Sequence, residues 1–111
     1  MKYFIDEEQR KASGKTCYFE FQKGKFRNKC WLKDSLCIHA NTFDLLNLDE
    51  LFSNSIVKFN YYGLTVINKE QWENFVIKSK DKKEWLSVIE ELTPWVKECF
   101  TKHDHFTICG L

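Results

Sequence analysis

The chain has 111 residues, of which 43% are hydrophobic and 30% are charged. This length fits a single domain over residues 1–111, and the composition is that of a globular protein and excludes a disordered one. The net charge of +1 excludes a strong overall field that would attract a charged ligand from a distance.

The charges are nevertheless unevenly distributed along the chain. Residues 11–33 carry seven Lys or Arg and a single acid, Glu20, for a net charge of +6. Residues 34–55 carry four acids and no Lys or Arg, for a net charge of −4; the acids are Asp34, Asp44, Asp49 and Glu50. These stretches are either solvated faces of opposite sign or binding surfaces.

Neither a membrane span nor an export signal is visible in the sequence. No stretch reaches the roughly 18 apolar residues that cross a bilayer, and residues 1–8 lack the apolar run of a signal peptide. The cysteine count is five, an odd number. We therefore expect a cytoplasmic protein with no membrane partner, whose cysteines are reduced, buried thiols.

The first part of the chain favours strands. Apolar, aromatic and β-branched residues predict strands at 2–6, 16–22, 30–33 and 36–40. A polar loop is expected at 9–15, and Lys23-Gly24 predicts a turn after which a hairpin strand returns from Lys25.

From residue 42 onward the hydrophobic period changes to that of helices. Apolar spacing predicts helices near 43–53, 69–80 and 82–102, and strands within 56–67, with a turn at 60–63, and at 105–109. Asn68 with Gln71, and Asp81 with Glu84, are expected to form helix-capping boxes, and Pro94 either kinks the last helix or starts a new one. The fold class is therefore α+β: a mainly antiparallel sheet of about five to six strands with two to four helices packed on one face.

One spacing is reminiscent of a metal site, namely Cys99-x3-His103-x-His105-x3-Cys109. On a strand, His105 and Cys109 point the same way but lie about 13 Å apart. Zinc bonds are about 2.0–2.3 Å long, so these two side chains cannot share one ion. We expect no metal and no cofactor.

Catalytic signatures are also missing from the sequence. Cys37 and His39 share one side of a strand, but no orienting Asn or Asp motif accompanies them. No phosphate-binding, dinucleotide-binding or hydrolase motif occurs. We expect that the protein is not an enzyme.

Two kinds of macromolecular partner remain. Basic residues alternate with aromatic residues in segment 15–33, a combination that binds single-stranded nucleic acid. The near-neutral net charge and the strand alternation, which turns Phe19 and Phe21 toward a core, argue against that partner. For a protein partner, Tyr61-Tyr62 would supply an interface anchor and the acids of 34–55 would supply charge.

The sequence also resembles a known class of proteins in its C-terminal half. The segments are 60–72 (Asn-Tyr-Tyr-Gly-Leu-Thr-Val-Ile-Asn-Lys-Glu-Gln-Trp), 92–100 (Leu-Thr-Pro-Trp-Val-Lys-Glu-Cys-Phe) and 106–110 (Phe-Thr-Ile-Cys-Gly). With them the chain resembles small bacterial immunity proteins of polymorphic-toxin systems, including contact-dependent growth inhibition. The resemblance implies a cytoplasmic protein that binds one cognate toxin domain and blocks it, often by covering a nuclease active site, but it transfers no binding residue.

We therefore expect an immunity protein that neutralises a toxin domain, with a nuclease as the expected target. Its expected partner-binding residues are Asp34, Asp44, Asp49, Glu50, Tyr61 and Tyr62. The alternative is a small nucleic-acid-binding protein that uses segment 15–33.

Overall fold

The computed structural model describes residues 1–55 and 58–111. One five-stranded sheet has the order β1-β3-β2-β5-β4, and every neighbouring pair is antiparallel. The strands are β1 (Ile5–Asp6), β2 (Tyr18–Lys23), β3 (Leu36–His39), β4 (Leu64–Asn68) and β5 (His105–Cys109). The helices are α1 (Glu7–Ser13), α2 (Ala40–Leu45), α3 (Leu48–Ser55), α4 (Lys69–Ser79) and α5 (Lys83–Phe100). The α+β class and the antiparallel sheet are thus confirmed.

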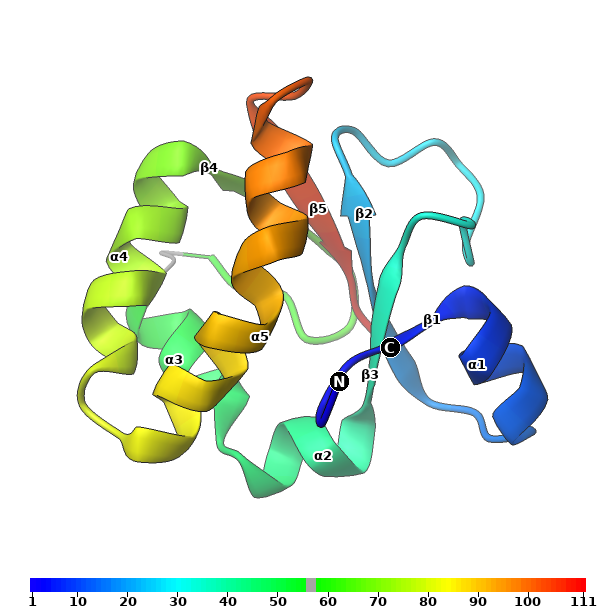
Figure 1. Ribbon diagram of the computed structural model, residues 1–111, viewed down its shortest axis with the longest axis horizontal. Helices are drawn as coiled ribbons and strands as arrows, with labels where there is room; N and C mark the ends of the chain where they lie inside the picture. Colours follow the sequence, from blue (N-terminus) through cyan, green and yellow to red (C-terminus); the bar gives the residue numbers. More distant parts are fainter. Residues whose placement is uncertain (56–57) are drawn as a thin grey trace.

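The core lies between the sheet and the helices α3, α4 and α5, with α5 crossing in front of the sheet in Figure 1. Strand alternation turns Phe19 and Phe21 of β2 and Phe106 of β5 toward these helices, where all three are at most 1% exposed. On the helices, apolar residues at spacings of three and four close the core, including Phe52, Phe75 and Leu92.

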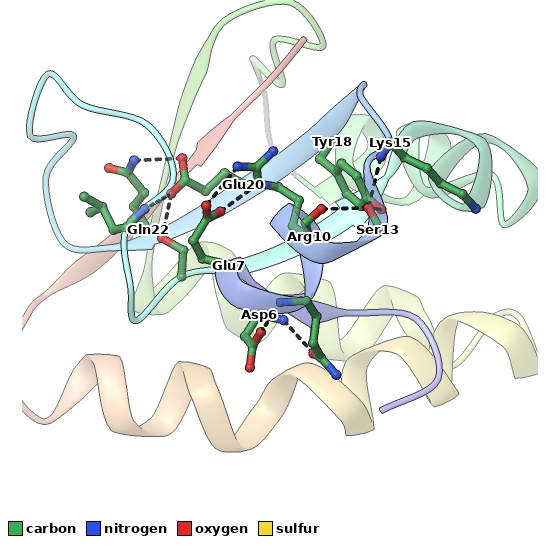
Figure 2. Close-up of polar contacts among 11 residues, drawn as sticks. Asp6, Glu7, Arg10, Ser13, Lys15, Tyr18, Glu20 and Gln22 are labelled. Atoms are coloured by element: carbon green, nitrogen blue, oxygen red, sulfur yellow. Dashed lines mark hydrogen bonds and ion pairs between the residues drawn. The ribbon is translucent and has the colours of Figure 1, made fainter.

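The opposite face of the sheet is covered by α1 and the loop 24–35, rather than by a long helix. Glu20 of β2 is 1% exposed on this face, and its carboxylate accepts hydrogen bonds from the Leu32 backbone N–H (2.8 Å), the Ser35 hydroxyl (2.7 Å) and the Gln22 amide (3.0 Å). Figure 2 shows this cluster beside the Glu7–Arg10 ion pair of α1. Because a buried carboxylate needs such donors, Glu20 fixes the path of the loop.

Several local predictions in the first half were wrong. Residues 7–13 form α1 because Asp6 and Gln9 make a capping box at its start, where a loop was expected over 9–15. A hairpin return from Lys25 and a strand at 30–33 were expected, but residues 24–35 form a loop. Backbone groups of this loop make hydrogen bonds with the side chains of Glu20 and Gln22. The first strand is shorter than expected, covering Ile5–Asp6.

The second half follows the predictions more closely. The helix expected at 43–53 is two helices, α2 and α3, because Asn47 adopts a positive φ of 52° between them. Of the strands expected over 56–67, only the second is present within the described residues, as β4; residues 56 and 57 lie outside them.

The two last helices were predicted nearly to the residue. The Asn68–Gln71 capping box of α4 is confirmed, but Asp81 does not cap α5, whose N-cap residue Lys82 makes no side-chain cap bond. Pro94 lies inside a continuous α5. Among the described helices, none is long and apolar enough to cross a membrane.

Candidate functional site

The residues that the structure assembles best into a surface come from α2 and from the turn before β4. The Tyr61 hydroxyl donates a hydrogen bond to Oδ1 of Asp44 at 2.9 Å. Helix α2 presents Asp44 outward because its neighbour Phe43 is fully buried in the core. The N-cap residue of the helix is His39, whose Nδ1 accepts a hydrogen bond from the Asn41 backbone N–H at 3.1 Å.

The Tyr61 ring joins this surface to the core. It packs edge-to-face on Phe19, with ring centroids 5.0 Å apart, and on Phe43 at 5.9 Å. On its other side the Tyr62 ring lies 4.9 Å away, and Tyr62 is 78% exposed. Leu45, next to Asp44, is 83% exposed. We call Asp44, Leu45, Tyr61 and Tyr62 the tyrosine–aspartate surface.

The turn that carries the two tyrosines is held by hydrogen bonds at both ends. Asn60 Oδ1 accepts from the Tyr62 N–H at 3.1 Å, and the Asn60 N–H donates to the Thr65 hydroxyl at 2.9 Å. The C-terminal residues pair with the same turn: Gly110 N–H donates to the Gly63 carbonyl at 2.7 Å and Leu111 N–H to the Tyr61 carbonyl at 2.9 Å. The surface is therefore built in advance of any binding event.

Electrostatics keep the Tyr61 phenol protonated. Burial raises its pKa to about 12, and the hydrogen bond to Asp44 and the charges of Asp44 and Asp49 act in the same direction. The phenol is consequently a hydrogen-bond donor over the whole physiological range. One Asp44 oxygen is bound to it, and the exposed carboxylates of Asp44 and Asp49 remain on this side of the molecule to meet a cation.

The other acids predicted for the site are placed differently. Glu50 lies next to Asp49 in the first turn of α3 but forms an ion pair with Lys82 at 3.4 Å. Asp34 precedes β3, whereas α2 with Asp44 follows it, so the whole of β3 separates these two carboxylates. The Asp34 carbonyl accepts from Trp95 Nε1 at 2.9 Å. The structure thus brings Asp44, Tyr61 and Tyr62 together and leaves Asp34 apart.

Sequence reasoning missed Leu45, because a single helix over 43–53 would have turned it toward the core. The helix breaks at Asn47, and this break turns Leu45 to solvent. Asn is the residue, after Gly, that most often ends a helix in a left-handed conformation, so Asn47 was the available signal.

The basic segment 15–33 offers charges but few free rings. Lys25, Arg27, Lys29 and Lys33 are exposed on the loop 24–35. Lys23 is paired with Glu98 at 2.7 Å, and its side chain is 11% exposed. Tyr18, Phe19 and Phe21 are buried, and Arg10 lies over the Trp31 ring at 3.9 Å. Arg10 therefore already covers the Trp31 ring, and among the rings of this segment the half-exposed Phe26 remains for a base to stack on.

The chemistry of Cys37 opposes a nucleophilic role. Burial and, after it, the nearby Glu20 carboxylate together raise the pKa of its thiol to about 12. His39 is engaged as the cap of α2 and packs edge-to-face on Tyr18 at 5.0 Å. A thiol held in the neutral form beside an occupied imidazole is a poor nucleophile.

The cysteine–histidine spacing near the C-terminus is used for packing. Cys99 is buried and its Sγ donates to the His105 carbonyl at 3.4 Å, while Cys109 is buried on β5. Within residues 1–55 and 58–111, no three His, Cys, Asp or Glu side chains converge on a point that could hold a metal ion.

Three comparisons with known proteins were made. No family model, no curated protein and no solved structure matches this chain.

Proposed function

We propose that this protein binds another protein through the tyrosine–aspartate surface and, as an immunity protein, neutralises it as a cognate toxin. One observation carries the proposal: a half-buried Tyr61 is fixed between the core and Asp44, with Tyr62 and Leu45 exposed beside it. Tyrosine is enriched at interface hot spots, and Leu45 adds exposed apolar area beside the two rings.

The charge of the surface indicates the kind of partner. Asp44 and Asp49 present carboxylates next to the two rings, so the partner should offer Lys or Arg around an apolar pocket. Nuclease domains bind a polyanion and need such basic clefts. A protein that places carboxylates over that cleft would exclude the nucleic acid, which is the inhibitory mechanism we propose.

The test begins with immobilised wild-type protein as bait and a matched bait carrying Asp44→Ala and Tyr62→Ala. A partner retained by the wild type should be lost from the variant bait, because truncating one hot-spot residue costs about 2 kcal/mol or more, roughly a 30-fold change in affinity. The purified partner should then lose its nuclease activity at one equivalent of this protein.

The control is Glu50→Ala. It removes an acid in the same helix turn as Asp49, but this acid is already paired with Lys82. This control should inhibit the partner as well as the wild type does. Retention of the partner by the double variant, or full partner activity in the presence of the wild type, would contradict the proposal.

A second candidate function rests on the four exposed basic residues gathered on the loop 24–35. If the loop binds single-stranded RNA, fluorescence anisotropy should show saturable binding at physiological salt, abolished by Lys25→Ala with Arg27→Ala. Because Arg10 already occupies the Trp31 ring, we place this function second.

A further inference from the structure

The two edges of the sheet are built differently. At one edge, β1 covers only Ile5–Asp6 and runs directly into α1. At the other edge, β4 has five residues, Leu64-Thr65-Val66-Ile67-Asn68, with no charged residue and no proline. Proteins that stay monomeric usually protect an edge strand by shortness, charge or proline. The edge at β4 has no such charge or proline.

The hydrogen-bonding groups on the free edge of β4 are identified by its pairing with β5. Gly110 N–H donates to the Gly63 carbonyl, and the register pairs Thr65 with Ile108 and Ile67 with Phe106. Since hydrogen-bonded pairs alternate along an antiparallel ladder, the backbone groups of Leu64, Val66 and Asn68 point away from β5. The Asn68 N–H is occupied by Gln71 Oε1 at 2.8 Å.

This leaves Leu64 and Val66 with outward N–H and C=O groups that no other described residue accepts or donates to. Their side chains, on the sheet face opposite to α3, α4 and α5, are 49% and 53% exposed. The edge therefore combines two donors and two acceptors that have no partner within residues 1–55 and 58–111, together with two half-exposed apolar side chains.

We propose that β4 pairs with β4 of a second copy of this chain, antiparallel and centred on Thr65, to form a symmetric dimer with one continuous sheet. A two-fold axis at Thr65 places Leu64 of each copy opposite Val66 of the other copy, which gives two equivalent pairs. Each of these pairs exchanges two backbone hydrogen bonds, so all the free groups of Leu64 and Val66 are satisfied at once. The same pairing brings the four apolar side chains together on one face.

Helix α4 supplies charge complementarity for a second copy. It starts directly after β4 and borders this side of the molecule in Figure 1, so a two-fold axis normal to the sheet sets two α4 helices antiparallel to each other. Its N-terminal half exposes Glu70 and Glu73, with Lys69 turned over the Phe100 ring at 5.9 Å, and its C-terminal end exposes Lys78 and Lys80. Antiparallel helices place the acids of one copy nearest the lysines of the other, as a self-complementary interface requires.

The dimer is expected to be concentration-dependent, since a pairing of this length buries less area than a permanent dimer does. The pairing uses none of the four residues of the tyrosine–aspartate surface: Asp44 and Leu45 lie on α2, and Tyr61 and Tyr62 lie in the turn that precedes Leu64. Experiments can therefore confirm the dimer even if they contradict the proposed toxin binding, and they can confirm the toxin binding even if they contradict the dimer.

Sedimentation equilibrium from about 1 μM to about 1 mM protein tests the pairing. The wild type should shift from the monomer to the dimer mass. Val66→Lys, which puts a charge against Leu64 of the other copy, and Val66→Pro, which removes the outward N–H, should each raise the dimer dissociation constant at least tenfold. Leu45→Lys puts the same charge at an apolar position on α2 that is more exposed than Val66, and this variant should dimerise as the wild type does.

Amide hydrogen exchange provides a second readout that does not depend on a variant folding. The amides of Leu64 and Val66 should become protected as the protein concentration rises, whereas those of Thr65 and Ile67, already bonded within the sheet, should not change. A wild type that stays monomeric at 1 mM, or a dimer unaffected by Val66→Lys, would overturn the proposal. So would protection of Leu64 and Val66 that appears only when a different protein is added, because the edge would then serve another partner's strand.

Discussion

The phenol of Tyr61 and the carboxylate of Asp44, 17 positions apart in sequence, are joined by a hydrogen bond of 2.9 Å. The bond ties the turn before β4 to helix α2 across the end of the sheet. A side chain that is bonded at its tip and packed on Phe19 along its ring has little freedom to lose when a partner binds.

This relationship predicts a distinctive alkaline titration. The pKa of Tyr61 is raised from its ordinary value of 10.0 to about 12, first by burial and then by Asp44. The unfolded chain thus ionises before the folded one, so the stability contributed by the neutral phenol is complete below about pH 10 and is lost as the pH rises to about 12. In an ultraviolet titration, Tyr61→Phe should remove a phenol that ionises near pH 12.

Asp44→Asn is the companion variant, because it keeps a hydrogen-bond acceptor but removes the charge. It should lower the pKa of Tyr61 toward the ordinary value while leaving the fold unchanged. If Tyr61→Phe instead removes a phenol that ionises near pH 10, the bond to Asp44 and the burial of Tyr61 do not persist in solution.

The five cysteines should divide into two reactivity classes. Burial was expected for all five from the sequence, but Cys17 and Cys30 are exposed, whereas Cys37, Cys99 and Cys109 are buried. Burial raises the pKa of Cys37 and of Cys109 to about 12 and also raises that of Cys99. Because the thiolate is the reactive form, an aromatic disulfide reagent at pH 8 should modify two thiols rapidly and three slowly.

Unfolding in denaturant should make all five cysteines react at one rate, which shows that the slow class is due to the fold. Cys17→Ser with Cys30→Ser should abolish the rapid phase and leave the slow phase as it was. Three or more rapid thiols in the native wild type would contradict the buried class.

The N-terminal segment should depend on a single carboxylate of α5. Glu91 Oε1 accepts from the backbone N–H of Tyr3 at 2.9 Å and of Phe4 at 2.8 Å. Hydrogen bonds to a charged group contribute about 1.5–3 kcal/mol, so we expect Glu91→Ala to lower the free energy of unfolding by about 2 kcal/mol. Hydrogen exchange at residues 3–5 should accelerate, whereas the exposed neighbour Glu90→Ala should change neither quantity.

Periodicity in the sequence predicted the elements that a hydrophobic face defines, and missed those that side-chain hydrogen bonds define. Helix α4 was predicted correctly because Trp72 and Phe75 share one face and Asn68 provides a cap. The path of the loop 24–35 depends on the buried Glu20, an acid whose partners Leu32 and Ser35 are 12 and 15 positions away. No local sequence pattern predicts such a contact.

The candidate site divides in the same way. Tyr61 and Tyr62 stood out as adjacent rings, and Asp44 as a member of an acidic stretch, but the hydrogen bond that joins Tyr61 to Asp44 is a tertiary contact. Asp34 belongs to the same acidic stretch, yet β3 carries it to the other end of the sheet. Closeness in sequence therefore indicated which residue types form the surface, but not which of the acids belong to it.

The last prediction concerns Gly110, which lies against the turn that carries the tyrosines. A Cβ at this position would be 2.3 Å from the Tyr61 carbonyl oxygen and 2.9 Å from the Gly63 nitrogen, both of them backbone atoms that cannot move aside independently. Gly110→Ala should therefore push the 61–63 turn away from the C-terminal residues and break the Gly110–Gly63 and Leu111–Tyr61 hydrogen bonds. Overpacking of this kind costs about 1–3 kcal/mol of stability.

The readout that separates a local from a general effect is the Tyr61 phenol. Gly14→Ala is the matched control: its backbone φ of 66° makes alanine unfavourable, but no atom lies within 4 Å of the new methyl group, and α1 is remote from the turn. Both variants should lower the denaturation midpoint, but only Gly110→Ala should shift the pKa of Tyr61 back toward 10 and weaken the binding of a captured partner. If Gly110→Ala loses stability while the phenol still titrates near pH 12, the turn has absorbed the methyl group without releasing Tyr61, and the C-terminal residues do not hold the tyrosine–aspartate surface in place.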